Sequence, residues 1–223
     1  MDDSVIPSKV INASACICDI HPEDAAFSWT SESSEDRKKW REKLGLSKAI
    51  EAEIHDLTDL WFEEKRIGWG GVFYSIEDAI DYQKKCVGIL DRVVVLEIGT
   101  TEEFAKEFIE EFGPKSEKEG EIGIVHALKR STLISPHSET VGFDTFGFES
   151  GGSFHSFICN SLEKDYKNKL GLSFSKSGLL MSFEEAVRAS EYNNDPDVGA
   201  EPVLWQPWIV NKIDANKAVE ATA

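Results

Sequence analysis

The chain has 223 residues, of which 41 are acidic and 24 are basic, and its formal net charge is −17. This negative charge argues against nucleic acid or an anionic membrane surface as the partner, because both attract positively charged proteins. Hydrophobic residues make up 41% of the chain, including 13 Phe and 6 Trp, which excludes disorder throughout and allows a buried core.

The amino-terminal region, residues 1–36, is predicted to be an irregular segment packed on the main domain. Within it, Val5 to Ile11 and Ala13 to His21 each have the composition of a short strand. The first residues are acidic where a secretory signal would be basic, and no apolar run reaches the ~20 residues that span a bilayer. The four cysteines do not indicate a disulfide framework. We therefore expect a cytoplasmic protein with reduced thiols.

A helix is predicted from about residue 36 to residue 66. In its second part, apolar residues recur at spacings of four, three and four, which places them on one helix face: Ile50, Ile54, Leu57 and Trp61. Residues 51–64 contain six acids and no Lys or Arg, and these acids lie mainly off the apolar stripe. The glycines from Gly68 to Gly71 end the helix and turn the chain.

After this turn, strand and helix signals alternate. Strands are predicted at 72–74, 92–98, 122–127, 140–149, 154–159 and 202–213, the last of them broken near Pro207. Helices are predicted at 76–90, 101–112, 161–170 and 183–192, with a loop at 113–121. Ser182 and Glu185 form a capping box for the last helix.

The alternation predicts an α+β fold, a mixed or antiparallel sheet with helices packed on it, in a single domain. We place the domain at residues 37–214, followed by a frayed tail at 215–223.

The segment around the Gly151-Gly152 turn holds the densest set of reactive side chains. Ser153, His155 and Cys159 lie there, and Asp144 lies on the strand before it. On one strand, His155 and Cys159 would be about 13 Å apart, from ~3.3 Å per residue, which is too far for direct activation. Asp144 would instead approach His155 across a hairpin. These four residues support the hypothesis of a small hydrolase or transferase, and a half-buried histidine bonded to the backbone is the competing interpretation.

Patterns for metals and phosphates are incomplete. Cys16, Cys18 and His21 are three possible zinc ligands, but no fourth ligand follows at a suitable spacing. The glycines at 68–71 follow a helix rather than a strand, and they lack the Gly-Lys-Ser/Thr of a phosphate loop. We therefore predict no metal site and no cofactor, and we favour a binding protein over an enzyme.

Three acid-rich segments are candidates for binding a basic partner: residues 51–64, residues 101–121 with eight acids and three Lys, and residues 184–201 with six acids and one Arg. If two of them share a face, the negative surface would steer a basic protein towards it. Tryptophan is enriched at binding hot spots, and a core position is the competing interpretation for each tryptophan. The predicted partner-binding residues are Asp56, Asp59, Glu63, Glu107, Glu110, Glu111, Trp205 and Trp208.

In this general character the chain resembles bacterial immunity proteins of polymorphic toxin systems. These are small, acidic, cytosolic α+β proteins without catalytic motifs, and they neutralise a toxin by binding it. The resemblance covers the character of the whole chain rather than a motif, so it assigns a role to no individual residue. It implies a non-enzymatic protein that blocks a basic partner, and a scaffold without a single ligand is a further alternative.

Overall fold

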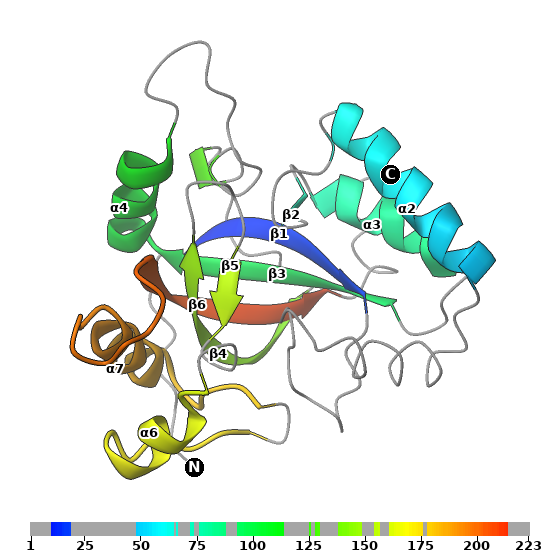
Figure 1. The fold of residues 1–223 in the computed structure, drawn as a ribbon. Coiled ribbons are helices and arrows are strands. Elements are labelled where there is room, and N and C mark those ends of the chain that lie inside the picture. The colour runs from blue at the N-terminus through cyan, green and yellow to red at the C-terminus, as the bar shows by residue number, and fades with distance from the viewer. Residues whose placement is uncertain are drawn as a thin grey trace.

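In the computed structural model, the described residues are 10–18, 48–64, 66, 72–73, 76–87, 93–113, 125, 128–129, 138–148, 154–156, 161–175 and 178–213. Their strands form one six-stranded sheet in the order β2-β1-β3-β6-β4-β5, with helices packed against it (Figure 1). Every pair of neighbouring strands is antiparallel. The predicted α+β class with an antiparallel sheet is therefore confirmed.

The bounds of most elements agree with the prediction within a few residues. The strands are β1 (Val10–Cys18), β2 (Val72–Phe73), β3 (Val93–Thr101), β4 (Ser138–Phe148), β5 (Phe154–Ser156) and β6 (Leu204–Ile213). The helices are α2 (Lys48–Glu63), α3 (Ile76–Val87), α4 (Glu102–Phe112), α6 (Glu163–Asn168) and α7 (Phe183–Asn193). The predicted helical residues 36–47, the loop after Gly113 and the tail at 215–223 lie outside the described residues.

The strand β1 differs most from the expectation for the amino-terminal region. Residues 10–18 form one continuous strand inside the sheet, paired with β3 from Val10–Thr101 to Cys18–Val93 and with β2 on its other edge. The sequence suggested an irregular segment with two separate short strands, Val5 to Ile11 and Ala13 to His21, which leave Asn12 between them. Pairing with a neighbour on each edge supplies the backbone hydrogen bonds, so a strand forms here without regular alternation.

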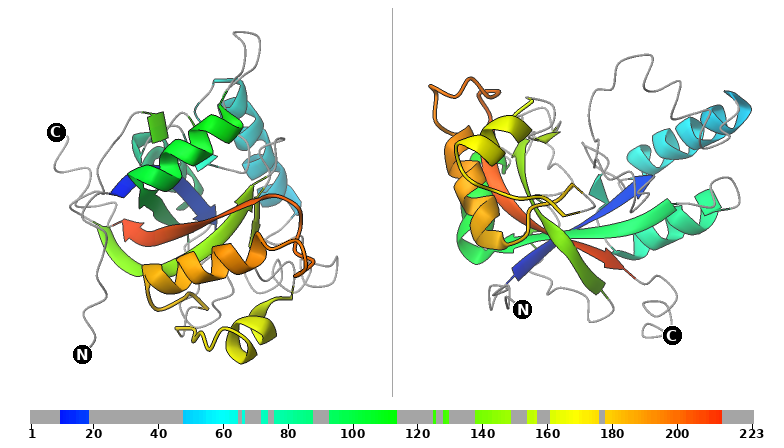
Figure 2. Two further views of the ribbon diagram at one scale, coloured as in Figure 1. Left: turned by 90° about the vertical axis from the view of Figure 1, so that its left-hand side faces the viewer. Right: turned by 90° about the horizontal axis from the view of Figure 1, so that it is seen from below.

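Two hydrophobic clusters lie on opposite faces of the sheet, as the alternation of side chains along a strand requires. Trp208 and Val210 of β6 belong to the cluster that contains Phe108 of α4, and we call this side the α4 face. Ile209 belongs to the cluster that contains Phe183 of α7, and we call this side the α7 face. Figure 2 shows α4 and α7 covering the two sides of the sheet.

The strand β6 runs through Pro207 without the predicted break. The carbonyl oxygen of Pro207 accepts a hydrogen bond from the Thr100 hydroxyl at 2.8 Å, so this residue directs its backbone groups towards β3. The ladder between β3 and β6 ends at Gly99–Ile209, before it reaches Pro207. Proline lacks a backbone N–H, and at position 207 no hydrogen bond of the β3–β6 ladder requires one. Proline is tolerated in a strand at such a position.

The strand predicted at 122–127 is wrong at the one position of that segment that the structure describes. Val125 is helical, as are Leu128 and Lys129 just after it. Val125 and Leu128 are both fully buried in the cluster on the α4 face. Their spacing of three places them on one side of a helical turn, whereas the β-branched composition of the segment favoured a strand.

The capping box predicted for α7 is confirmed, with one change in its geometry. The Ser182 hydroxyl accepts the Glu185 N–H at 3.1 Å, as a capping box requires. The Glu185 carboxylate reaches one residue further back than usual and accepts the Met181 N–H at 2.8 Å.

Candidate functional site

The predicted pairing of His155 with Asp144 does not form. His155 lies on β5 opposite Gly147 of β4, whereas Asp144 is three residues further along β4, about 10 Å away at ~3.3 Å per residue. Asp144 is paired with Trp208 and so lies on the α4 face, while Gly147 and His155 lie on the other face. Ser153 and Cys159 are outside the described residues.

Glu201 is the acidic partner of His155 that the sequence analysis missed. A Glu201 carboxylate oxygen lies 3.2 Å from His155 Nδ1, and the imidazole is 19% exposed. The sheet order brings the two residues together, because β4 lies between β5 and β6 and Glu201 precedes β6. No periodicity or local spacing in the sequence links residues 155 and 201.

Asp144 is a buried carboxyl group rather than a partner for the histidine. Its side chain is 1% exposed, and one carboxylate oxygen accepts the Thr145 N–H at 2.7 Å. Burial raises the pKa of Asp144 well above its ordinary value, and the hydrogen bond from Thr145 offsets only part of this effect. The group is therefore a source of pH-dependent stability.

The two tryptophans predicted to bind a partner belong to the core, so that prediction is wrong for both. Trp205 is 1% exposed and Trp208 is 0% exposed. The Trp208 ring makes edge-to-face contacts with Phe108 and Phe148, at centroid distances of 5.8 and 5.6 Å. The hydrophobic clusters on the α4 face and the α7 face cover the two sides of β6, so these side chains do not reach the surface.

The six predicted acidic residues are exposed, but they form two surfaces instead of one. Asp56, Asp59 and Glu63 lie on α2, and Glu107, Glu110 and Glu111 lie on α4. Figures 1 and 2 show α2 and α4 at opposite ends of the sheet.

The acids at the carboxyl-terminal ends of these helices do not stabilise them. Neither α2 nor α4 has a basic residue in its last turn. In that turn α2 carries Glu63, and α4 carries Glu110 and Glu111. The carbonyl end of a helix is the negative end of its dipole, and a charge of the same sign there costs about 0.3–1 kcal/mol. The placement of these acids therefore requires an explanation other than helix stability.

On α2 the acids form a narrow stripe that points away from the core. At 100° per residue, Asp56, Asp59 and Glu63 lie within roughly 60° of one another, opposite the buried Trp61. Leu60 and Phe62 border the stripe on its two sides, and they are 48% and 42% exposed. We call these five residues the outer face of α2.

The inner side of α2 is held by Trp61, which is 0% exposed. Its ring makes edge-to-face contacts with Phe73 of β2 at 6.1 Å and with Tyr82 of α3 at 5.3 Å. The Arg66 guanidinium lies over the same ring, with its central carbon 3.5 Å from the centroid. A cation at this distance is attracted by the indole ring, and it covers the face of the ring over which it lies.

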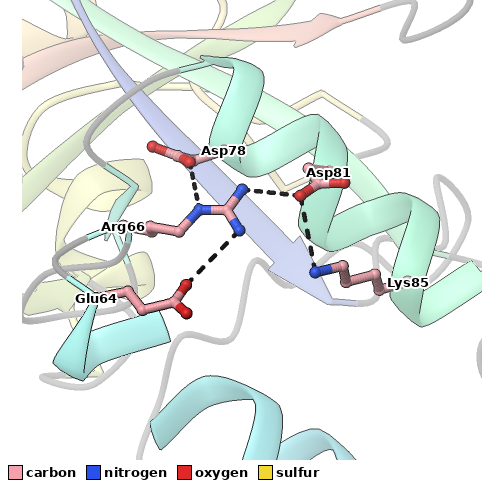
Figure 3. A network of polar contacts seen from close by, with 5 residues as sticks. All are labelled: Glu64, Arg66, Asp78, Asp81 and Lys85. Carbon is pink, nitrogen blue, oxygen red and sulfur yellow. Dashed lines mark hydrogen bonds and ion pairs between the residues drawn. The ribbon is translucent and has the colours of Figure 1, made fainter. Parts of the chain in front are cut away.

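Arg66 also connects the end of α2 to α3 through a network of ion pairs (Figure 3). Arg66 Nε donates to Asp78 at 2.7 Å and Arg66 Nη2 donates to Asp81 at 2.8 Å, while Glu64 lies 3.9 Å from Nη1. Lys85 lies 3.8 Å from Asp81. Burial alone would lower the pKa of Arg66, but hydrogen bonds to Asp81 and Asp78 outweigh it and the pKa is raised. We call Arg66, Asp78 and Asp81 the arginine clamp.

We expect Arg66→Met to lower the free energy of unfolding by about 1–3 kcal/mol, because it removes two charge-assisted hydrogen bonds and the contact with Trp61. Arg66→Lys keeps the charge, but an ammonium group cannot donate to both aspartates from one plane. Its free energy of unfolding should therefore lie between those of the wild type and Arg66→Met. Urea unfolding followed by circular dichroism measures both. Equal stability of the lysine variant and the wild type would contradict the role of the planar guanidinium.

The described part of the chain contains neither a metal-binding cluster nor a membrane-spanning helix. No group of three or more His, Cys, Asp or Glu side chains is arranged there to hold a metal ion. Among the same residues, no helix combines the length and apolar character needed to cross a bilayer. The position of His21 and the side chains of Cys16 and Cys18 lie outside this description.

Comparisons with protein-family models, with curated proteins and with solved structures find no match to this chain.

Proposed function

We propose that the chain is an acidic, cytoplasmic binding protein that neutralises a basic protein partner, specifically an immunity protein for a bacterial toxin. The observation that carries the proposal is the outer face of α2. Three carboxylates are gathered there, one of them in the last turn, where it opposes the helix dipole. Exposed acids gathered on one face of a helix attract a positively charged protein.

The mechanism would be occlusion without chemistry. A nuclease, or another protein that binds phosphates, carries a basic surface, and an acidic protein that covers this surface competes directly with the substrate. The net charge of −17 also accelerates encounter with such a partner, because long-range attraction steers association.

The test is protection of cells from a toxin. We would express each protein encoded on either side of its gene, with and without the chain, and we expect one of them to carry a basic, toxic domain. The expected result is normal growth with the chain present and arrested growth without it. Growth arrest in both cases, with the two proteins confirmed to be expressed, would overturn the proposal.

A second candidate function rests on the contact between His155 Nδ1 and the Glu201 carboxylate. A carboxylate at Nδ1 orients an imidazole and leaves Nε2 to act as a base, which is the arrangement of many hydrolases and transferases. Under this hypothesis, His155→Gln and Glu201→Gln should each abolish the activity of the chain. If a His155→Gln variant protects cells as well as the wild type, the enzymatic hypothesis is wrong.

A further inference from the structure

We infer that the outer face of α2 is the docking surface for the basic partner, with Leu60 and Phe62 as its apolar anchors. This inference rests on the proposed function and names the surface through which it would act. The partner it fits is a protein that presents a row of Lys or Arg side chains, bordered by apolar groups.

The first argument is the combination of exposed apolar and acidic side chains on one helix. The large apolar residues that are clearly exposed among those described are Leu60, Phe62 and Met181, and two of these three border the acids of α2. Apolar anchors surrounded by charged residues are the usual composition of a protein interface, in which the anchors supply affinity and the rim supplies steering.

The second argument is the contrast with α4, which is equally acidic. Its apolar side chains face inwards: Ala105 and Phe108 are buried, and Ile109 and Phe112 are packed against the same cluster. The helix α4 therefore offers charge but no apolar anchor.

The third argument is that α2 is held in place before a partner arrives. Trp61 fixes its inner side, and the arginine clamp connects its end to α3 (Figure 3). The clamp also uses the carboxylates of Asp78 and Asp81 internally, so the charge offered to a partner comes from the outer face. A docking helix that is already ordered loses less entropy on binding.

The proteins encoded on either side of the gene are first tested for a basic domain that binds the wild type. The experiment then measures binding of the wild type and four variants to this domain, inactivated by mutation of its own active site. Leu60→Ser is compared with Met181→Ser, which changes an apolar side chain that is 52% exposed and distant in sequence. Glu63→Lys is compared with Glu111→Lys, because both reverse an exposed charge in the last turn of an acidic helix. Thermal unfolding of each variant confirms that it remains folded.

Leu60→Ser is expected to weaken binding by on the order of tenfold, because it removes an apolar anchor. Glu63→Lys is expected to slow association by on the order of tenfold, because it reverses a steering charge. The two control variants should bind within about twofold of the wild type, as changes outside an interface do.

If the wild type binds and both α2 variants bind as tightly and as fast as the wild type, the docking surface is wrong and the proposed function stands. If Glu111→Lys weakens binding while Glu63→Lys does not, the partner docks on α4 instead and the inference is also overturned. If the folded wild type binds none of the proteins encoded on either side of the gene, the proposed function fails together with the inference.

Discussion

Replacing Trp208 with alanine is expected to lower the free energy of unfolding by about 3–5 kcal/mol, the usual cost of truncating a large buried aromatic side chain. Trp208 is 0% exposed and contacts Phe108 and Phe148, so truncation opens a cavity between α4 and the sheet. Its indole N–H has no hydrogen-bond partner among the described residues. The loss should therefore come from packing, and Trp208→Phe should cost much less than Trp208→Ala.

Urea unfolding followed by circular dichroism measures these changes, with Leu60→Ala as the exposed control. The control should change stability by less than about 0.5 kcal/mol, as surface substitutions usually do. A tryptophan that served only to bind a partner would behave differently. Its alanine variant would remain as stable as the wild type and would lose binding, and this outcome would contradict the buried position of Trp208.

Asp144→Asn is expected to stabilise the protein at neutral pH and to reduce the dependence of its stability on pH. Burial raises the pKa of Asp144 in the folded state above the unfolded value of ~3.9. As the pH rises above ~3.9, the unfolded state releases the proton first, so folding becomes less favourable until the pH passes the folded pKa. Each unit by which the folded pKa is raised corresponds to ~1.4 kcal/mol of stability lost.

Asparagine does not titrate, and its side-chain oxygen can still accept the Thr145 N–H. The gain over the wild type should therefore be largest near neutral pH and should disappear below the unfolded pKa. The measurement is the free energy of unfolding of both proteins across this pH range, with Asp197→Asn as the control at an exposed aspartate. A constant difference between Asp144→Asn and the wild type at every pH would show that the carboxyl group does not titrate as proposed.

Local elements of this fold could be predicted from the sequence because their causes are local. The helix predicted at 101–112 is α4, in which Phe104, Phe108 and Phe112 recur at a spacing of four. The structure buries Phe108 and partly covers the other two. The Ser182 capping box predicted the start of α7. Caps and periodic faces involve residues within a few positions of each other, so a single sequence contains the whole signal.

Long-range partners could not be predicted in the same way. The sheet order, the pairing of β1 with β3 and the contact between His155 and Glu201 all join residues that are far apart in the chain. Asp78 and Asp81 are three residues apart, which places both on one side of α3. Arg66 lies between these two aspartates and covers Trp61 because the chain turns back from α2 to α3. No local pattern in the sequence encodes that arrangement of the two helices.

The interpretation of Trp205 and Trp208 as surface residues failed for a related reason. The prediction placed a break in the strand near Pro207, between the two tryptophans, and gave a core position as the competing interpretation for each of them. The structure places Pro207 where the β3 ladder has ended, so the strand continues and both tryptophans are buried.

The central claim is that negative charge on this chain recruits a basic protein, and the most direct measurement is the affinity of that complex as a function of salt concentration. Attraction between surface charges is screened at distances beyond ~10 Å at 0.1 M salt and beyond ~3 Å at 1 M salt. The account predicts that affinity falls steadily across this range and that the fall is smaller for Glu63→Lys. An affinity that does not change with salt would contradict it.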